Sequence, residues 1–325
     1  MRIGIIGVGV YSVALATALC KNKKNVINMW TESQDKCDEY NTKGCITGLL
    51  DGTTLPSVNM FTDFDSVVNG VDLVIIGVAA HFLEDTMKKL APSLLKKQVI
   101  CIATKGIDAK NGAFLSDVVY GIYPTKLLAV ISGPSFAVDV VSGEPIGLSV
   151  GSRSNIAIKT IAECFKGSNI KLRATKDIIG VQICGSVKNV IAVAAGMLGG
   201  MGYSNSAQAF LITESLHDIK GLIKAVGGNP KTIMSYAGVG DLLLTCTSVK
   251  SRNYSFGKLV GSGSSKEEID KYLSETTVEG YYTLKSVRKL VRKRNIKLPI
   301  VDLIYNIIFN EANLTLLVNF LYKKD

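Results

Sequence analysis

Two glycines near the N-terminus are the first residues whose spacing could support chemistry. Gly7 and Gly9 lie in Gly7-Val8-Gly9-Val10-Tyr11-Ser12, between the apolar run Arg2–Ile6 and the helix-favouring run Ala14–Leu19. A strand, a glycine turn and a helix in this order bring backbone N–H groups to a helix N-terminus, where they can bind a pyrophosphate. We therefore expect the turn residues to contact a dinucleotide cofactor, namely Gly7, Gly9, Val10, Tyr11 and Ser12.

Ser12 occupies the position of the third glycine of the dinucleotide-binding fingerprint, and its small side chain is a tolerable departure. Glu32 follows a second apolar run, Val26–Trp30, at about the twenty-residue spacing at which a carboxylate binds the adenosine ribose and repels a 2′-phosphate. The alternative is that Glu32 opens the next helix, with Ser33 able to cap it. No arginine stands beside Glu32, so we expect NAD(H) to be preferred, with NADP(H) as the second possibility.

A lysine within an apolar helical pattern is the best candidate for proton transfer. Lys188 is flanked by Val187 and Val190 inside the run Ile178–Leu198. An ammonium there is costly unless it faces a polar site, and burial lowers its pKa toward the working range. The alternative is a lysine whose stem lies along the protein while its charge reaches water.

Asp241 and Thr245 are candidates to hold this lysine. Asp241 can pair with the ammonium; the alternative is that it caps the helix that begins with Leu242–Leu244. Thr245 lies one helical turn further on and can share the same helix face.

Arg252 offers the best phosphate chemistry in the chain. Ser251 and Asn253 flank it, so that a guanidinium fork, a hydroxyl and an amide meet at a predicted transition from loop to helix. The alternative is an ordinary surface arginine. Lys105 ends a predicted strand, at the edge where doubly wound sheets bind their ligands.

The first half of the chain alternates strand patterns with helical patterns. Val, Ile and Leu run almost unbroken through several strands, which indicates a parallel sheet that is covered on both faces. The pattern predicts an α/β Rossmann-type, doubly wound, mostly parallel sheet. The predicted strands are Arg2–Ile6, Val26–Trp30, Leu73–Val78, Val99–Ala103, Leu127–Ser132 and Ile146–Gly151, with helices such as Val13–Lys21 and Thr86–Leu90 between them.

After about Thr175 the strand patterns end and long helical patterns follow. We therefore predict two domains: residues 1–175 as a dinucleotide-binding domain and residues 176–325 as an all-helical substrate domain. The predicted helices are Ile178–Leu198, Ala207–Val226, Tyr281–Arg294 and Val301–Ile308.

The net charge of +10 favours an anionic partner. The densest basic run, Lys285–Arg294, has the spacing of an amphipathic helix with a solvated basic face, and it lacks the interleaved aromatic residues of a nucleic-acid platform. We expect a small anion and no nucleic acid. The longest uncharged span, Asn189–Thr213, is rich in glycine and polar residues, so we expect buried helices and no integral membrane span.

The seven cysteines form no CxxC pair, and the chain has only two histidines. These numbers indicate neither a disulfide framework nor a zinc site, and we expect no metal. A cytoplasmic location fits this composition best. An export signal in the first twenty residues is the alternative, but a glycine turn interrupts that stretch.

Several motifs, in order and over nearly the whole chain, resemble the NAD(P)-dependent glycerol-3-phosphate dehydrogenases. Together they are far more specific than any one of them. They are Ala103-Thr104-Lys105-Gly106, Ser132-Gly133-Pro134-Ser135-Phe136-Ala137, Lys188-Asn189-Val190-Ile191-Ala192, Gly240-Asp241-Leu242, Thr245-Cys246-Thr247, Ser251-Arg252-Asn253 and Val278-Glu279-Gly280.

The resemblance implies reversible reduction of dihydroxyacetone phosphate to sn-glycerol 3-phosphate, which feeds glycerophospholipid synthesis, by a homodimer. It implies that Lys188 donates and accepts the proton while Asp241 and Thr245 orient it. The implied substrate contacts are Lys105, Gly133, Ser135, Ser251, Arg252 and Asn253. The implied cofactor contacts beyond the glycine turn and Glu32 are Lys105, Ala137, Arg252 and Glu279.

The chain also departs from the family pattern at Ser12, Ala79, Val138, Glu214 and Tyr254. The departures leave two alternatives open. One is a sister dehydrogenase of another small phosphorylated hydroxy compound, and the other is a non-catalytic NADH-binding protein. The retained Lys188, Asp241 and Arg252 argue against the second, because a sensor has no need of a proton donor.

Overall fold

The computed structural model describes residues 1–50 and 58–323, and the chain divides into two compact units. One unit comprises Met1–Lys105 and Leu115–Ile178, and we call it the sheet unit. The other comprises Gly106–Phe114 and Ile179–Asp325, and we call it the helical unit. The loop Gly106–Phe114 therefore belongs with the helices although it follows a strand of the sheet.

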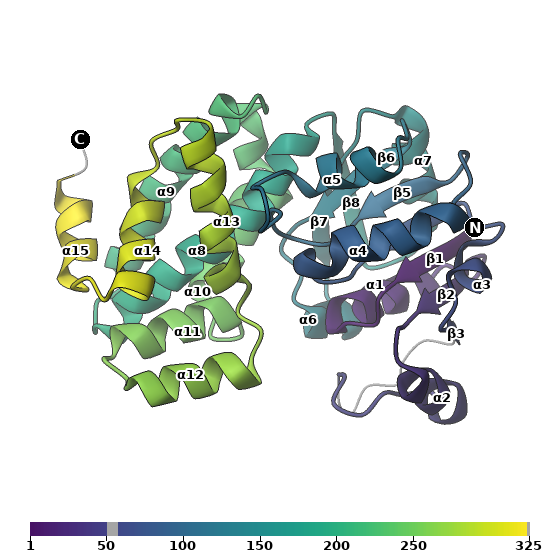
Figure 1. Cartoon of the computed structure of the whole chain (residues 1–325), viewed down its shortest axis with the longest axis horizontal. Coiled ribbons are helices and arrows are strands. Elements are labelled where there is room, and N and C mark those ends of the chain that lie inside the picture. Colours follow the sequence, from purple (N-terminus) through teal and green to yellow (C-terminus); the bar gives the residue numbers. More distant parts are fainter. Residues whose placement is uncertain (51–57, 324–325) are drawn as a thin grey trace. The chain divides into compact units, whose positions relative to one another are not determined.

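The described residues of the sheet unit form one eight-stranded sheet (Figure 1). Its strands are β1 (Arg2–Ile6), β2 (Val26–Trp30), β3 (Asn59–Phe61), β4 (Leu73–Ile76), β5 (Val99–Ile102), β6 (Leu128–Ser132), β7 (Ile146–Gly151) and β8 (Ile170–Thr175). The strand order is β3-β2-β1-β4-β5-β6-β7-β8, and all neighbours are parallel except β6 and β7. The order reverses between β1 and β4, which is the place where doubly wound sheets bind ligands.

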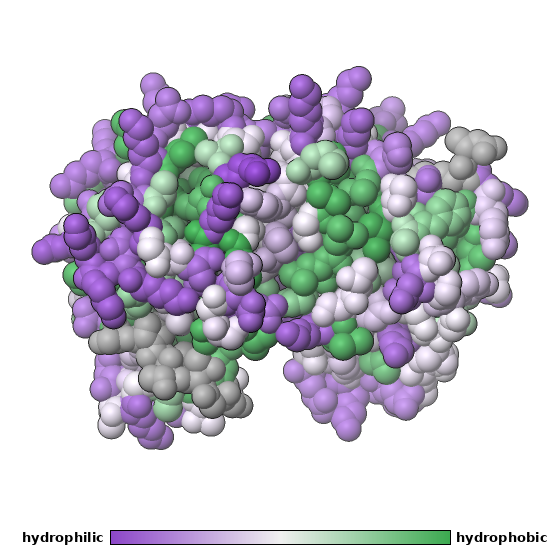
Figure 2. All heavy atoms as spheres, turned by 180° about the vertical axis from the view of Figure 1, so that it is seen from behind, coloured by the Kyte–Doolittle hydropathy of each residue, from purple (hydrophilic) through white to green (hydrophobic). Residues whose placement is uncertain are grey.

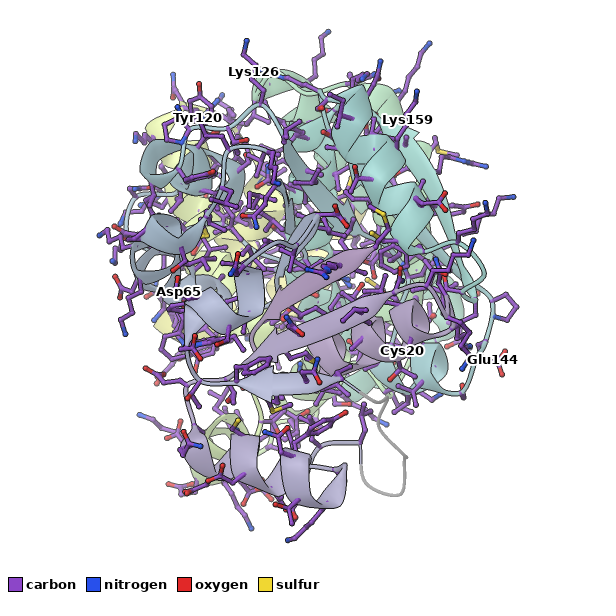
Figure 3. The ribbon with its side chains drawn as sticks, turned by 90° about the vertical axis from the view of Figure 1, so that its right-hand side faces the viewer. Cys20, Asp65, Tyr120, Lys126, Glu144 and Lys159 are labelled. Carbon is purple, nitrogen blue, oxygen red and sulfur yellow. The ribbon has the colours of Figure 1, made fainter. Side chains whose placement is uncertain are left out.

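Helices cover both faces of this sheet because its central strands are apolar on both. In β4, Leu73 and Ile75 belong to the core that α1, α6 and α7 share, while Val74 and Ile76 are buried on the opposite face. In Figure 3 the labelled Lys126, Lys159 and Glu144 lie at the periphery of the unit, where they are exposed. The helices are α1 (Val10–Cys20), α2 (Gln34–Lys43), α3 (Phe64–Val68), α4 (Ala80–Leu90) with the turn η1 (Ala91–Ser93), α5 (Leu115–Ile122), α6 (Ala137–Val141) and α7 (Asn155–Cys164).

The helical unit consists of helices and short turns. They are α8 (Ile178–Gly200), α9 (Asn205–Ala225), η2 (Pro230–Met234), the π turn η3 (Tyr236–Gly240), α10 (Asp241–Thr247), α11 (Arg252–Gly261), α12 (Lys266–Glu275), α13 (Glu279–Lys293), α14 (Pro299–Asn310) and α15 (Thr315–Tyr322). The loop Gly106–Phe114 lies against α13, where Lys289 Nζ donates a hydrogen bond of 3.4 Å to the carbonyl of Ala109. The sheet and this all-helical second unit confirm the predicted fold class.

Helix α8 is long and apolar enough to cross a membrane, but 89% of its most apolar window is buried inside the structure. No other helix of residues 1–50 and 58–323 passes that test of length and composition. Within the helical unit, α8 contacts α10 through Lys188, α11 through Gly196 and α13 through Asn189. The glycine-rich span Asn189–Thr213 includes the break between α8 and α9. Its α8 part is buried as predicted, but the prediction of buried helices is wrong for much of the start of α9, where Asn205, Ala209 and Phe210 are exposed.

All six predicted strands are present, and the differences lie in the short and peripheral elements. Two strands were not predicted. β3 has only three residues, and β8 is an edge strand whose side chains are largely exposed. Helix α4 begins at Ala80, six residues before the predicted Thr86. The prediction missed its start because the first turn is mostly exposed and lacks an apolar repeat.

Ser12 is accommodated by a glycine on the neighbouring strand connection. Its Oγ donates a hydrogen bond of 3.3 Å to the carbonyl of Gly77. A Cβ at Gly77 would lie 2.2 Å from Ser12 Oγ, whereas the next chain atom beyond Ser12, the carbonyl oxygen of Ile6, would be 3.6 Å away. In this contact between α1 and the segment after β4, the glycine is therefore Gly77 after the strand, and the helix carries Ser12.

We expect Gly77→Ala to lower the free energy of unfolding by about 1 kcal/mol, because Ser12 must rotate and give up its hydrogen bond. In the Ser12→Gly background the same substitution should cost nothing, since the clashing hydroxyl is gone. Urea unfolding of the two single variants and the double variant measures this coupling. An equal loss in both backgrounds would contradict the paired arrangement.

Candidate active site

The structure brings Lys188, Asp241 and Thr245 together inside the helical unit. Lys188 Nζ lies 2.6 Å from Asp241 Oδ1 and 2.9 Å from Thr245 Oγ1. All three are buried, with 6%, 1% and 3% of their surfaces exposed. Thr245 donates its own hydrogen to the backbone carbonyl of Asp241 at 2.6 Å, so its oxygen is free to accept from the ammonium. An ammonium is therefore held by a carboxylate and a hydroxyl at fixed positions.

A π turn directs Asp241 toward this centre. Gly238 within η3 has φ −86° and ψ −109°, and a Cβ there would lie 2.0 Å from the carbonyl oxygen of Ile233. Gly240 is the N-cap of α10, and Asp241 is its first residue. Asp241 is therefore not the N-cap of α10, and the alternative role as a helix cap is excluded. Single π turns often occur at functional sites.

The neighbourhood of the pair is apolar. Cys246, the next residue of α10, is fully buried, and burial raises the pKa of its thiol, an effect that the Lys188 ammonium partly offsets. The thiol is thus neutral, and Asp241 carries the negative charge opposite Lys188. In such surroundings an ion pair is maintained only with short hydrogen bonds on both partners.

The predicted phosphate residues lie at the start of α11. Arg252 is its first residue and is exposed. Ser251 is the N-cap and accepts a hydrogen bond of 3.3 Å from the backbone N–H of Tyr254. Asn253 is buried, and its side chain bonds to Asn189 and to the backbone N–H of Gly280. The side chains of Ser251 and Asn253 therefore fix the helix that carries Arg252.

Glu279, a predicted cofactor contact, is the first residue of α13, and its carboxylate accepts a hydrogen bond of 2.9 Å from Asn189. Sequence reasoning did not assign a role to Asn189. The signal that could have found it is an amide beside Lys188 in a run that is otherwise apolar. A buried amide needs hydrogen-bonding partners, and here they come from α11 and α13.

A second cluster lies at the carboxyl end of the sheet. Ser135 Oγ donates to the carbonyl of Gly133 at 3.0 Å, and Tyr11 and Ser135 hydroxyls are 3.0 Å apart, so Tyr11 donates to Ser135. Lys105 Nζ donates to the same carbonyl at 3.3 Å and lies 5.6 Å from the centre of the Tyr11 ring. The sheet unit therefore gathers four of the predicted site residues at one edge.

The glycine turn of the sheet unit fits a pyrophosphate. Gly7 has φ +106°, a conformation that other residues rarely adopt. Gly9 is the N-cap of α1 and makes no side-chain cap, and a Cβ there would meet nothing within 4 Å. Gly9 and Val10 are exposed, so the N-terminus of α1 is accessible to an anion.

The other predicted cofactor residues are more dispersed. Glu32 is exposed beyond β2, with one carboxylate oxygen 3.8 Å from Lys89 Nζ on α4. Ala137 is the first residue of α6. Within residues 1–50 and 58–323, no group of three or more His, Cys, Asp or Glu side chains could hold a metal ion.

Both units match one known family. Residues 2–157 match the family described as NAD-dependent glycerol-3-phosphate dehydrogenase N-terminus, and residues 177–319 match the C-terminus of the same family. A glycerol-3-phosphate dehydrogenase (NAD(P)+) from Photorhabdus laumondii is 34% identical over 312 residues, which cover 95% of this chain and 91% of that protein. The enzyme of the same name from Vibrio cholerae is 33% identical over 327 residues, covering 99% and 94%.

Solved structures show the same similarity. Glycerol-3-phosphate dehydrogenase from Coxiella burnetii superimposes with a TM-score of 0.91 at 30% identity and covers 99% of each chain. Glycerol-3-phosphate dehydrogenase from Plasmodium falciparum has a TM-score of 0.88 at 21% identity, covering 100% of this chain and 96% of that one, and shows the likeness of fold.

We expect Asp241→Asn to lower the free energy of unfolding by about 3 kcal/mol, because it leaves a buried ammonium without a counter-charge. Adding Lys188→Met should restore much of that loss, since neither charge then remains. Asp302→Asn is the matched control: its ion pair with Arg288 is 2.8 Å long, close to the 2.6 Å of the Lys188–Asp241 pair, but the Asp302 side chain is 44% exposed. That change should cost less than about 1 kcal/mol. Equal losses at both sites in urea unfolding would refute the proposed burial effect.

Proposed function

The chain belongs to the NAD-dependent glycerol-3-phosphate dehydrogenase family, and on that basis we propose that it catalyses the reversible, NAD(P)H-dependent reduction of dihydroxyacetone phosphate to sn-glycerol 3-phosphate. The observation that carries the proposal is the buried Lys188, held 2.6 Å from Asp241 and 2.9 Å from Thr245. A ketone reductase needs a proton donor of this kind in a water-poor site.

Lys188 handles the proton of the reaction. When hydride reaches the C2 carbonyl carbon, negative charge develops on the carbonyl oxygen, and a cation stabilises it best in surroundings of low polarity. Lys188 transfers a proton from Nζ to that oxygen and completes the alcohol, and in the reverse direction it takes the proton back. Asp241 and Thr245 orient the ammonium. NADH, when bound at the glycine turn, supplies the hydride.

Arg252 and Lys105 bind the anionic substrate. Arg252 is exposed at the start of α11 and presents the fork geometry that phosphate favours. Ser251 and Asn253 contribute by fixing the start of that helix, as their hydrogen bonds to Tyr254 and Gly280 support. Lys105, whose Nζ donates to the carbonyl of Gly133 beside Ser135, is the proposed substrate cation of the sheet unit.

Residues 1–175 then form the dinucleotide-binding domain and residues 176–325 the substrate domain. The product supplies glycerophospholipid synthesis, and the enzyme works in the cytoplasm as a homodimer. Apolar side chains at the surface support the dimer. Figure 2 shows one face of the molecule, on which hydrophobic patches interrupt the hydrophilic surface. Exposed apolar residues of the helical unit are Phe210, Met234, Leu243, Val249 and Tyr282.

The departures from the family pattern leave the Lys188 centre intact. Tyr254 of α11 is buried against the glycines of α8, and its hydroxyl donates a hydrogen bond to Gln208 of α9. Ala79 is the N-cap of α4, with φ −62° that a proline would also adopt. Val138 lies on the exposed side of α6. At these three positions the departures alter local packing or surface and none of the proposed substrate contacts.

We expect Lys188→Met to lower kcat by at least about 100-fold, because general acid catalysis contributes roughly 10²–10⁴-fold. The dissociation constant for NADH, measured by fluorescence titration, should stay near the wild-type value. The exposed Lys250→Met serves as the control and should retain activity. A Lys188→Met enzyme with more than about a tenth of wild-type kcat would remove the lysine from the mechanism.

Glu32 should set the choice of coenzyme. Its carboxylate repels a 2′-phosphate, so Glu32→Gln should raise kcat/KM for NADPH relative to NADH by about tenfold. Lys89, 3.8 Å away, weakens the repulsion, and Lys89→Gln should therefore shift the ratio toward NADH. Lys88→Gln, whose partner is Glu84, should leave it unchanged. The measurement is the ratio of initial rates with NADPH and with NADH. An unchanged ratio in Glu32→Gln would exclude Glu32 as the residue that sets the coenzyme preference.

A further inference from the structure

Helices α8 and α11 meet backbone to backbone through glycines on both sides. A Cβ at Gly257 would lie 2.0 Å from the carbonyl oxygen of Val193, and one at Gly261 would lie 2.1 Å from that of Met197. In the other direction, a Cβ at Gly196 would lie 2.1 Å from the carbonyl oxygen of Tyr254. Four residues further along α8, a Cβ at Gly200 would lie 2.2 Å from the carbonyl oxygen of Lys258. Each helix therefore has two glycines four residues apart against its partner, and none of the four positions can accept a larger residue.

The two helices advance in the same direction along this seam. Val193 faces Gly257, and four residues later Met197 faces Gly261. Four residues earlier, the same step pairs Asn189 with Asn253, and Asn253 Nδ2 donates a hydrogen bond of 3.0 Å to Asn189 Oδ1. Both asparagines are buried, with 2% and 7% of their surfaces exposed. An amide pair thus closes the seam at its N-terminal end.

The start of α13 satisfies the rest of the amide pair. Asn189 Nδ2 donates to Glu279 Oε2 at 2.9 Å, and Asn253 Oδ1 accepts from the backbone N–H of Gly280 at 2.7 Å. A Cβ at Gly280 would lie 2.5 Å from the carbonyl oxygen of Asn189, so α13 begins directly against α8. Three helices are therefore joined at one pair of side chains.

The glycines hold the two helices close and already disfavour a slip, because a slip would bring a larger side chain against the partner's backbone. The buried amide pair fixes the register further, since any slip leaves an amide without its partner in an apolar interior. Here the pair adjoins both proposed substrate cations. Lys188 immediately precedes Asn189 on α8, and Arg252 immediately precedes Asn253 on α11.

We propose that Asn189 is a positioning residue that sets the distance between the proton-donating Lys188 and the phosphate-binding Arg252. It thereby selects phosphorylated ketones with a single carbon between the carbonyl carbon and the phosphate ester oxygen. The inference rests on the proposed function, because it assumes that one substrate spans both cations. A slip of one residue along a helix is about 1.5 Å, and displacements of that order are large for catalysis.

The test compares dihydroxyacetone phosphate with its homologue of one more methylene, 1,4-dihydroxybutan-2-one 4-phosphate. In Asn189→Ala, kcat/KM for the shorter ketone should fall roughly 100-fold, while that for the longer one falls far less, so that discrimination shrinks. Val193→Ala is the matched control, because it removes buried side-chain atoms of α8 one turn beyond Asn189 without touching the amides. It should lower the thermal midpoint comparably and leave the substrate ratio unchanged.

A second pair of variants keeps the test decisive if Asn189→Ala does not fold. Asn189→Asp retains the acceptor for Asn253 but places a carboxylate against Glu279, so discrimination should fall. Adding Glu279→Gln restores this hydrogen bond in the reverse direction, because the new amide at position 279 donates to the new carboxylate at position 189. Discrimination between the two ketones should then recover toward the wild-type ratio.

The measurements separate a failure of the proposed function from a failure of the positioning role of Asn189. A wild-type enzyme that reduces neither ketone would overturn the proposed function and the inference with it. A wild-type enzyme that discriminates, with an unchanged ratio in Asn189→Ala or no recovery in the Asn189→Asp/Glu279→Gln enzyme, would overturn the positioning role alone. In that case the amide pair would be a structural link and nothing more.

Discussion

The buried ion pair of Lys188 and Asp241 is the constraint around which the helical unit is built. An ammonium in an apolar interior is tolerable only when a carboxylate and a hydroxyl meet it at short range, and these come from a different helix. The requirement explains why α8 can be apolar around a single charge and why a π turn precedes α10.

The sheet unit shows a complementary solution in which small residues do the positioning. Gly7 and Gly9 leave the first turn of α1 open, and Ser12 is admitted only because Gly77 lacks a side chain. A fingerprint glycine can therefore be replaced by a larger residue without loss of the fold when the residue that it contacts is a glycine. The neighbour is 65 residues away in the chain, so the exchange is invisible in the motif itself.

The sequence was informative where a signal is local and repetitive. The apolar runs of β1 and β7 and the apolar length of α8 predict their bounds closely, because burial leaves continuous apolar stretches. The bounds of β2 were predicted as well, although its buried residues alternate with more exposed ones. β3 and β8 were missed because the first is too short and the second is an edge strand with exposed charges. Lys188, Asp241 and Thr245 were predictable as a group, but the partners of Asn189 come from helices far along the chain and depend on their packing.

Many of the residues that make the chain resemble its family act on other residues of the protein. Ser251 caps α11, Asn253 bonds to Asn189 and Gly280, and Glu279 bonds to Asn189. A motif that surrounds a charged residue can therefore be retained because it fixes that charge in space. This distinction matters for assigning function, because a positioning residue and a proton donor affect different properties of an enzyme. In the roles proposed for Asn189 and Lys188, substrate choice and chemistry are separable properties of adjacent positions on α8.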